Sequence, residues 1–346
     1  MQHKTLRSLL VAFAIALVAQ PVHAQVAYDS PRGRVEILGL QHWSLQMLRD
    51  SVRSRVPGME LHDAACMVVL RDSLSFADAL VHTFLDAPSQ GLPVQEFMVI
   101  KLIEPQERAR VQWLRIERDT FTVLRPEYAP IVLAVTDTGG GFEIVRVLSP
   151  LQLYGHGPQL RSRVIAAEPA SVRADAERLW TFLEHRRTED DWRRARRVLL
   201  RDGQYANRVI AASILANFSD RDTTWYALID ALRDPDEGVR YAAAAVLQAF
   251  PRRTIDWTPK AETLRLLLGG TNVSATQQVI ETLARTQVSP SLARPLLRQN
   301  GYWVLSHLRA GYPGAASSAR ALLVQLHGGV DLGPRAAKWD EWIGTL

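Results

Sequence analysis

Apolar residues in the second half of the chain recur at helical spacing. Trp225, Leu228 and Leu232 share one face of a predicted helix, and the turn Asp234-Pro235-Asp236 ends it. A second apolar run follows directly, at positions 239, 242, 243, 246 and 247. Apolar positions three and four residues apart are typical of an amphipathic helix. The pattern predicts successive antiparallel helix pairs from about residue 170 to the C-terminus.

Two of these predicted helix pairs are copies of each other. Residues 200–218 align with residues 232–250 at an offset of 32, without a gap. Both segments begin Leu-Arg-Asp, carry an arginine and an alanine pair at matching positions, and end in phenylalanine. A period of this size indicates stacked structural repeats that share one continuous core. A helical bundle without repeats is the alternative, and the common register disfavours it.

The clearest unit, LIDALRDPDEGVRYAAAAVLQAF, resembles a HEAT repeat. The likeness lies in the Asp-Pro-Asp between the helices, the Val-Arg pair and the alanine-rich second helix. It implies an α-solenoid over 170–346, with aspartates and arginines of successive units paired as a buried ladder. The resemblance gives that role to Asp202, Arg208, Asp234 and Arg240. Arg240→Ala is then expected to destabilise the fold by leaving Asp234 without its partner.

The tail VDLGPRAAKWDEWIGTL is similar to the closing cap of some bacterial HEAT proteins. Pro334 would begin a last helix, and Trp339 and Trp342 are three residues apart on it. The resemblance implies that the two indoles cover the open end of the stack.

The first half of the chain predicts a different architecture. Residues 33–105 are predicted to form a strand, two helices and two strands. Ser44 caps the first predicted helix, and the second spans 61–70. This β-α-α-β-β order resembles a POTRA module, which implies docking of extended strands at a sheet edge. The predicted fold class is α+β, with a small α/β module over 25–110 followed by the HEAT-like solenoid. Between them, 111–169 is expected to be a helical connection.

The stretch VTDTGGGF in this connection contains Asp137-Thr138-Gly139, the triplet of aspartic proteases. Such enzymes need two aspartates that share a proton, so a single triplet would require a homodimer. The glycines are not followed by Gly-Lys-Ser/Thr, so a phosphate loop is not supported. Residues 126–148 fit either a helix pair or a β-hairpin, and the glycines suit the turn in both.

The N-terminus predicts export. Residues 1–24 combine two basic residues, a short apolar run and the small-residue ending Val22-His23-Ala24, which is typical of a signal peptide cut after Ala24. The formal net charge of the whole chain is only +5, which argues against nucleic acid as a partner. After residue 24 no apolar run is long enough for an integral membrane segment. The expected location is therefore periplasmic or secreted.

No pattern in the sequence predicts a metal, a cofactor or a catalytic group. The histidines lack the spacing of a helical metal site, and Cys66 is the only cysteine. Cys66 lies in AACMVVL and is expected to be a small buried residue. The densest basic run, from Arg186 to Arg197, is interpreted as a solvated helix face paired with neighbouring acids.

These patterns favour an exported, non-catalytic scaffold of a bacterial envelope that binds a protein. If 239–250 lines the inner face, Tyr241 and Gln248 contact the partner, with Gln277 and Glu281 at the equivalent places of the next unit. The alternatives are an enzyme, either a dimeric aspartic protease using Asp137 or a HEAT-type lyase, and an assembly factor acting through the N-terminal sheet edge. The patterns leave the partner and the oligomeric state unidentified.

Overall fold

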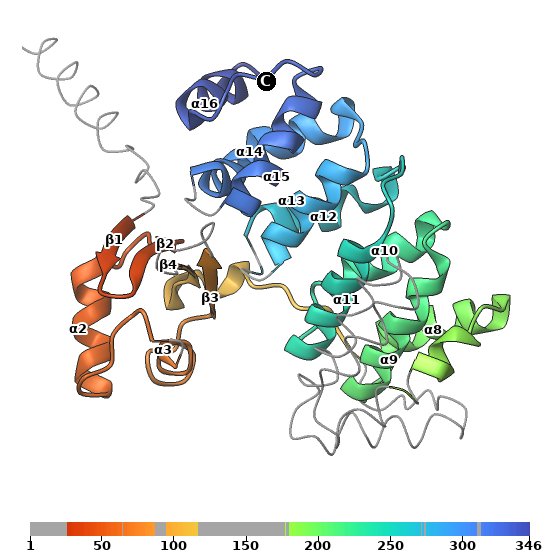
Figure 1. Ribbon diagram of the computed structural model, residues 1–346, viewed down its shortest axis with the longest axis horizontal. Helices are drawn as coiled ribbons and strands as arrows, with labels where there is room; N and C mark the ends of the chain where they lie inside the picture. The colour runs from red at the N-terminus through yellow and green to blue at the C-terminus, as the bar shows by residue number, and fades with distance from the viewer. Residues whose placement is uncertain are drawn as a thin grey trace, which may run out of the picture. The chain divides into compact units, whose positions relative to one another are not determined.

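The protein is described here by a computed structural model (Figure 1). The structure describes residues 26–63, 65–86, 95–116, 177, 180–270, 272, 275–309 and 313–346. The chain divides into two compact units, Met1–Pro105 and Gln106–Leu346. The first contains a small sheet with short helices and the second is helical, so the predicted α+β class is confirmed. The first unit ends at Pro105 instead of the predicted residue 110.

The sheet of the first unit has four described strands in the order β1-β2-β4-β3. Its central strands β2 and β4 are parallel, whereas β1 and β3 pair with them in antiparallel fashion. The predicted strands correspond to β2, β3 and β4, and the structure adds β1 at the edge. The bounds are β1 Val26–Ser30, β2 Gly33–Leu38, β3 Asp78–Asp86 and β4 Gln95–Ile103.

One face of this sheet forms a core with two helical segments. The first, α2 (Leu45–Arg55), begins where predicted, because the Ser44 side chain accepts a hydrogen bond from the Met47 N–H at 3.1 Å. The second was predicted over 61–70 but begins later, as α3 (Cys66–Val68) followed by a π-helical turn over Val69–Ser73. Residues 61–63 form turns instead. Both segments bury apolar side chains against β2 and β4.

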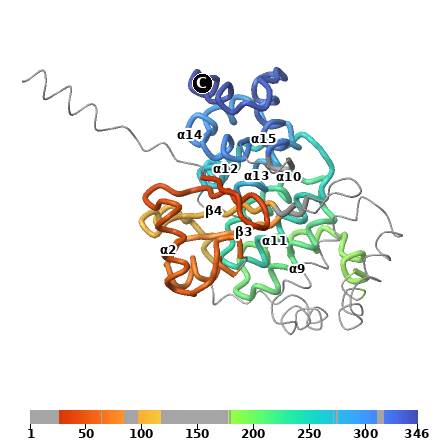
Figure 2. Tube along the Cα trace, turned by 60° about the vertical axis from the view of Figure 1, so that its left-hand side comes forward, coloured from red at the N-terminus to blue at the C-terminus, as the bar shows by residue number. Residues whose placement is uncertain are grey.

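The second unit contains consecutive helices that pack as pairs: α8 with α9, α10 with α11, α12 with α13, and α14 with α15. Further contacts join α9, α11, α13 and α15 into a row, which can be followed in Figures 1 and 2. The bounds are α8 Glu189–Arg201, α9 Tyr205–Leu215, α10 Asp222–Ala231, α11 Glu237–Ala249, α12 Ala261–Leu268, α13 Ala275–Arg285, α14 Pro290–Arg309, α15 Pro313–Leu326 and α16 Ala336–Gly344. Short 3-10 turns span Pro105–Arg110, Ala216–Phe218 and Thr258–Lys260.

The segments that repeat in the sequence occupy equivalent places. Each contains the end of one helix, a short turn and the next helix, α9 in the first copy and α11 in the second. In both copies the arginine Nη1 donates to the backbone carbonyl six residues earlier, from Arg208 to Asp202 at 2.7 Å and from Arg240 to Asp234 at 2.8 Å. The repeat in sequence is therefore a repeat in local structure.

The C-terminal helix α16 packs against α14. Trp339 is fully buried, and its Nε1–H donates to the Gly333 carbonyl at 2.7 Å. The rings of Trp339 and Trp342 contact each other and both contact His327, with centroids 4.8 to 5.8 Å apart. The predicted last helix is present, although it begins at Ala336 instead of Pro334.

Within the described part of the chain, no helix combines the length and the apolar character needed to cross a bilayer.

Candidate interaction surface

Three of the four predicted binding residues meet between α11 and α13. The Glu281 carboxylate accepts a hydrogen bond from the Gln248 amide at 3.1 Å and one from the Gln277 amide at 2.9 Å. Gln277 and Glu281 are four residues apart on α13, and Gln248 reaches them from α11, so the network spans two successive helix pairs. We call these three residues the polar seam. Its side chains are exposed or half-buried.

Tyr241 lies on α11 seven residues before Gln248, which places it two turns earlier on about the same helix face. It is 40% exposed, whereas the α11 residues on the opposite face are buried in the core. An exposed tyrosine offers a large apolar ring with a polar tip, a combination enriched in protein interfaces. The four predicted residues therefore lie on the exposed sides of two neighbouring helices.

Sequence reasoning missed Arg285, which fixes the end of α11 beside the polar seam. Its guanidinium donates to the Gln248 carbonyl at 2.6 Å, to the Leu247 carbonyl at 3.3 Å and to the Phe250 carbonyl. The last carbonyls of a helix have no partner within the helix, so a guanidinium that bonds several of them ties the two helices together. Burial lowers the pKa of Arg285 below its ordinary value.

A buried ion pair joins successive repeats just before the start of α11. Arg208 in α9 donates through Nε and Nη2 to the two carboxylate oxygens of Asp234, at 2.8 and 2.9 Å. The Asp234 side chain is fully buried and that of Arg208 is 4% exposed. Asp202, one repeat earlier, is also fully buried and accepts from the Gln204 N–H and the Asn207 amide.

The expectation that Arg240 is the partner of the Asp234 carboxylate is wrong. Arg240 donates instead to the backbone carbonyls of Asp234, at 2.8 Å, and Pro235, at 3.1 Å. Both carboxylate oxygens of Asp234 bond Arg208 from the preceding repeat, so the arginine within the same repeat closes the turn between its own helices. The ion pair therefore joins repeats, and Arg240 stabilises one of them.

A short non-helical segment, residues 111–116, lies against the turns of the helical unit. The Arg233 guanidinium donates to the Gln112 carbonyl at 3.0 Å, and the Leu114 N–H donates to the Arg233 carbonyl. The Trp113 ring lies 4.7 Å from the Arg240 guanidinium carbon. This segment was expected to start a helical connection, but its backbone hydrogen bonds go to a neighbouring turn. The rest of that connection, 117–169, with Asp137 and the glycines, lies outside the described residues.

Just before this segment, Arg110 anchors the chain to a later helix pair. Its Nη2 donates to the Gly269 carbonyl at 3.0 Å, and its guanidinium lies 5.8 Å from the Trp303 ring. Because Gly269 ends α12 and Arg233 follows α10, the stretch from Arg110 to Leu114 bonds the C-terminal ends of two helices. Donors from this stretch thus satisfy carbonyls that the helices themselves leave free.

Cys66 and His82, two reactive side chains in the described part of the first unit, are both held uncharged by burial. The Cys66 Sγ–H donates to the Leu61 carbonyl at 3.3 Å, and burial raises the pKa of this thiol to about 12, so it stays protonated. Burial and then the charge of Lys101 lower the pKa of His82 to about 4, so it is neutral at pH 7. Among the described residues, no three His, Cys, Asp or Glu side chains are grouped as a metal site would require.

No family model, curated protein or solved structure matches this chain.

Proposed function

We propose that the chain is an exported, non-catalytic interaction protein whose helix pairs form a HEAT-like solenoid that binds a protein partner. The partner would dock on Tyr241 and the polar seam of Gln248, Gln277 and Glu281. The observation that carries the proposal is the hydrogen-bonded seam itself, which is accessible to solvent and spans two repeats. Export rests on the signal-peptide pattern of residues 1–24.

The geometry suits recognition of a protein surface. The Glu281 carboxylate is already oriented by two amides, so a partner that adds a third donor orders few side chains on binding. Tyr241 adds a ring with only two side-chain torsions, which makes it an economical anchor. The Arg208–Asp234 pair, before the start of α11, and the Arg285 contacts, at its end, hold the helices in place. A fixed backbone with polar side chains on its exposed side suits the binding of a protein partner better than catalysis.

The test is partner capture with a matched surface control. The full chain would be used as bait on an extract of its own envelope, beside Tyr241→Ala/Glu281→Ala and the control Lys338→Ala/Glu341→Ala. Lys338 and Glu341 are exposed residues of α16, far along the chain from the seam. We expect the same partner with the wild type and the control, and its loss with the seam variant. Equal capture by all three chains would refute the assignment of this surface.

The two alternatives make different predictions. A dimeric aspartic protease would lose all activity in Asp137→Asn, whereas the scaffold would keep its partner. An assembly factor would bind through an outer strand of the sheet, β1 or β3, so the seam variant would leave binding intact. Removing residues 26–105 would then abolish it. This deletion ends where the first unit ends and leaves the 111–116 segment on the helical unit.

A further inference from the structure

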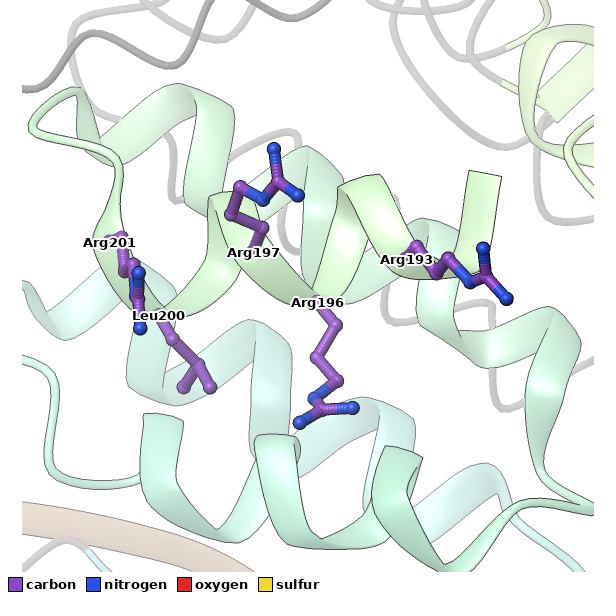
Figure 3. A pocket seen from close by; sticks show the side chains of 5 residues that line it. All are labelled: Arg193, Arg196, Arg197, Leu200 and Arg201. Atoms are coloured by element: carbon purple, nitrogen blue, oxygen red, sulfur yellow. The ribbon is translucent and has the colours of Figure 1, made fainter. Parts of the chain in front are cut away.

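A row of arginines on α8 lines a pocket of about 380 Å³, formed by Arg193, Arg196, Arg197, Leu200 and Arg201. Figure 3 shows the guanidinium groups spread along the helix, with Arg193 and Arg201 toward its two ends and Arg196 and Arg197 directed to different sides. Leu200 provides the apolar part of the lining and packs on the core. We call these five residues the arginine pocket.

The carboxylates at the start of α8 are already bound. Glu189 accepts from Arg193 at 2.9 Å and also from Arg221, and Asp190 lies 3.3 Å from Arg194. The third acid, Asp191, accepts from the Thr188 backbone and hydroxyl in a capping box. The acids of this helix therefore neutralise its first two turns. The predicted pairing of the basic run with neighbouring acids holds for Arg193 and Arg194, and Arg186 lies 3.8 Å from Asp191.

Two arginines in the second half of α8, Arg196 and Arg197, are not neutralised by these acids. Within the described residues, neither Arg196 nor Arg197 lies within ion-pair distance of a carboxylate, and both are exposed. Trp192 supports the first of them: Arg196 lies 5.5 Å from its ring and Arg221 lies 4.5 Å from it. Stacking on an aromatic ring holds a guanidinium while leaving its N–H donors available. The pocket thus presents ordered donors for an anion.

The spacing of the charges indicates the shape of that anion. Arg193, whose Nε already bonds Glu189, and Arg201 are eight residues apart, which corresponds to about 12 Å along a helix. One phosphate or carboxylate cannot contact the whole row. An extended peptide places side chains on one side at intervals of about 7 Å, so two or three acidic residues in alternation would match it. Guanidinium groups bind carboxylates in a bidentate manner, which favours such a partner.

We propose that the arginine pocket of α8 binds an extended acidic segment of another protein. This site shares no residue with Tyr241 or the polar seam, so it goes beyond the function proposed above and can fail or succeed independently. Leu200 would contact an aliphatic part of the bound segment between its carboxylates.

The probe is a fluorescein-labelled ten-residue peptide with glutamate at alternate positions and serine between them, measured by fluorescence anisotropy. The protein is the full chain. The test variant is Arg196→Gln/Arg197→Gln, and the control is Arg298→Gln, an exposed arginine of α14 outside the pocket. Tyr241→Ala/Glu281→Ala is measured in parallel, and circular dichroism checks that each variant folds.

We expect the peptide to bind the wild type, Arg298→Gln and Tyr241→Ala/Glu281→Ala with equal affinity. The double arginine variant should raise Kd roughly tenfold, as loss of two exposed charge contacts implies. Raising the salt concentration should also weaken binding, and a peptide with glutamine in place of glutamate should not bind.

Three results would overturn the proposal. Equal weakening by Arg298→Gln would mean a diffuse charge effect. Displacement of the peptide by inorganic phosphate at the same concentration would mean a site for a single small anion. Tighter binding of a short duplex DNA, lost in the same arginine variant, would assign the pocket to nucleic acid.

Discussion

The two units of the molecule differ in what mainly holds a buried carboxylate: backbone N–H groups in the first and an arginine side chain in the second. In the first unit, Glu104 is fully buried and accepts backbone N–H groups from Gln41, His42 and Trp43 at 2.7, 2.8 and 2.9 Å. The His42 Nδ1 lies 2.7 Å from the same carboxylate. In the second unit, the fully buried Asp234 accepts from the Arg208 guanidinium at 2.8 and 2.9 Å and from a single backbone N–H, that of Asp236, at 2.8 Å.

The difference shows which kinds of support a sequence can reveal. Arg208 and Asp234 recur with the period of the repeat, so their side chains stand out when the copies are aligned. Glu104 is bound mainly by backbone N–H groups more than 60 residues earlier in the chain, and every residue except proline carries such a group. Hydrogen bonds from backbone N–H groups do not depend on which residues provide them, so the sequence does not reveal them. A pair of charged side chains can be recognised from its residue types.

Within the helical unit, the repeat itself changes at the third pair. Asp202, Asp234 and Asn272 each stand three residues before the helix that follows, α9, α11 or α13. Asn272 is fully buried like the aspartates, and its amide nitrogen donates to the Leu232 carbonyl at 3.2 Å. An amide donates where a carboxylate accepts, so at this position the third pair bonds a backbone carbonyl of the second instead of an arginine. Like Glu104 in the first unit, Asn272 is a buried polar side chain that bonds the backbone.

The largest effect is expected from Arg208→Ala. The substitution leaves the buried Asp234 carboxylate without its counter-charge and frees the Asp202 carbonyl. Breaking a buried pair from one side costs about 3–5 kcal/mol, because the remaining charge stays desolvated. Urea denaturation followed by circular dichroism at pH 7 measures the free energy of unfolding.

The same urea denaturation of Arg240→Ala and Arg197→Ala provides the comparison for Arg208→Ala. Arg240→Ala removes two bonds to carbonyls and the stack on Trp113, so we expect about 1–3 kcal/mol. Arg197 is exposed, and its removal should cost less than about 0.5 kcal/mol. If Arg240→Ala were as damaging as Arg208→Ala, the ion pair between repeats would not be the main support.

Gly270→Ala tests the third pair, where the buried Asp of the first two repeats is replaced by Asn272. Gly270 has φ +71°, and an added Cβ would lie 2.2 Å from the Trp303 ring. The left-handed backbone and the overlap together should cost about 2–4 kcal/mol. Gly328→Ala is the matched control, because its φ is +75° and nothing lies within 4 Å of the added Cβ. It should cost about 1 kcal/mol. Equal losses of melting temperature would show that Trp303 moves aside easily.

Glu104→Gln tests the hydrogen bonds from backbone N–H groups to the Glu104 carboxylate. The amide keeps the shape of the side chain but places N–H groups against backbone N–H groups, and we expect a loss of about 2 kcal/mol in the first unit. Hydrogen exchange of the amides of residues 41–43, followed by mass spectrometry, should accelerate, whereas exchange in α9 and α11 should not change. Faster exchange in both units would contradict an effect confined to the first.

The same carboxylate makes the first unit sensitive to acid. Burial alone would raise the pKa of Glu104, but the N–H groups of Trp43, Gln41 and His42, with the His42 ring, hold it below its ordinary value of 4.5. The stabilisation is therefore complete above pH 4.5 and is lost as pH falls through the lower pKa of the folded state. Titrating the wild type and Glu104→Gln, we expect their difference in stability to shrink in this window. A difference in stability that stays constant with pH would show that Glu104 does not cause the sensitivity to acid.

The sequence alone predicted the α+β class, three of the four described strands, the start of α2 at Ser44 and the repeat with a period of 32. Each of these follows from local chemistry: alternation, capping and helical spacing act between residues close in the chain. The repeat also indicated that Arg208 and Asp234 matter, because copies of one unit share their contacts. Helical spacing likewise predicted that Gln248, Gln277 and Glu281 lie outside the apolar core.

Only the tertiary structure decided which partner each of these groups takes. Asp234 pairs with the arginine of the preceding repeat, Arg285 binds the end of α11, and residues 111–116 lie against a turn after α10. These contacts join groups 26 to 121 residues apart, and most of them end on a backbone atom. The local sequence pattern sets the conformation of each helix and strand. Many donors and acceptors are chemically alike, however, so their pairing is decided by which of them the fold brings within hydrogen-bond distance.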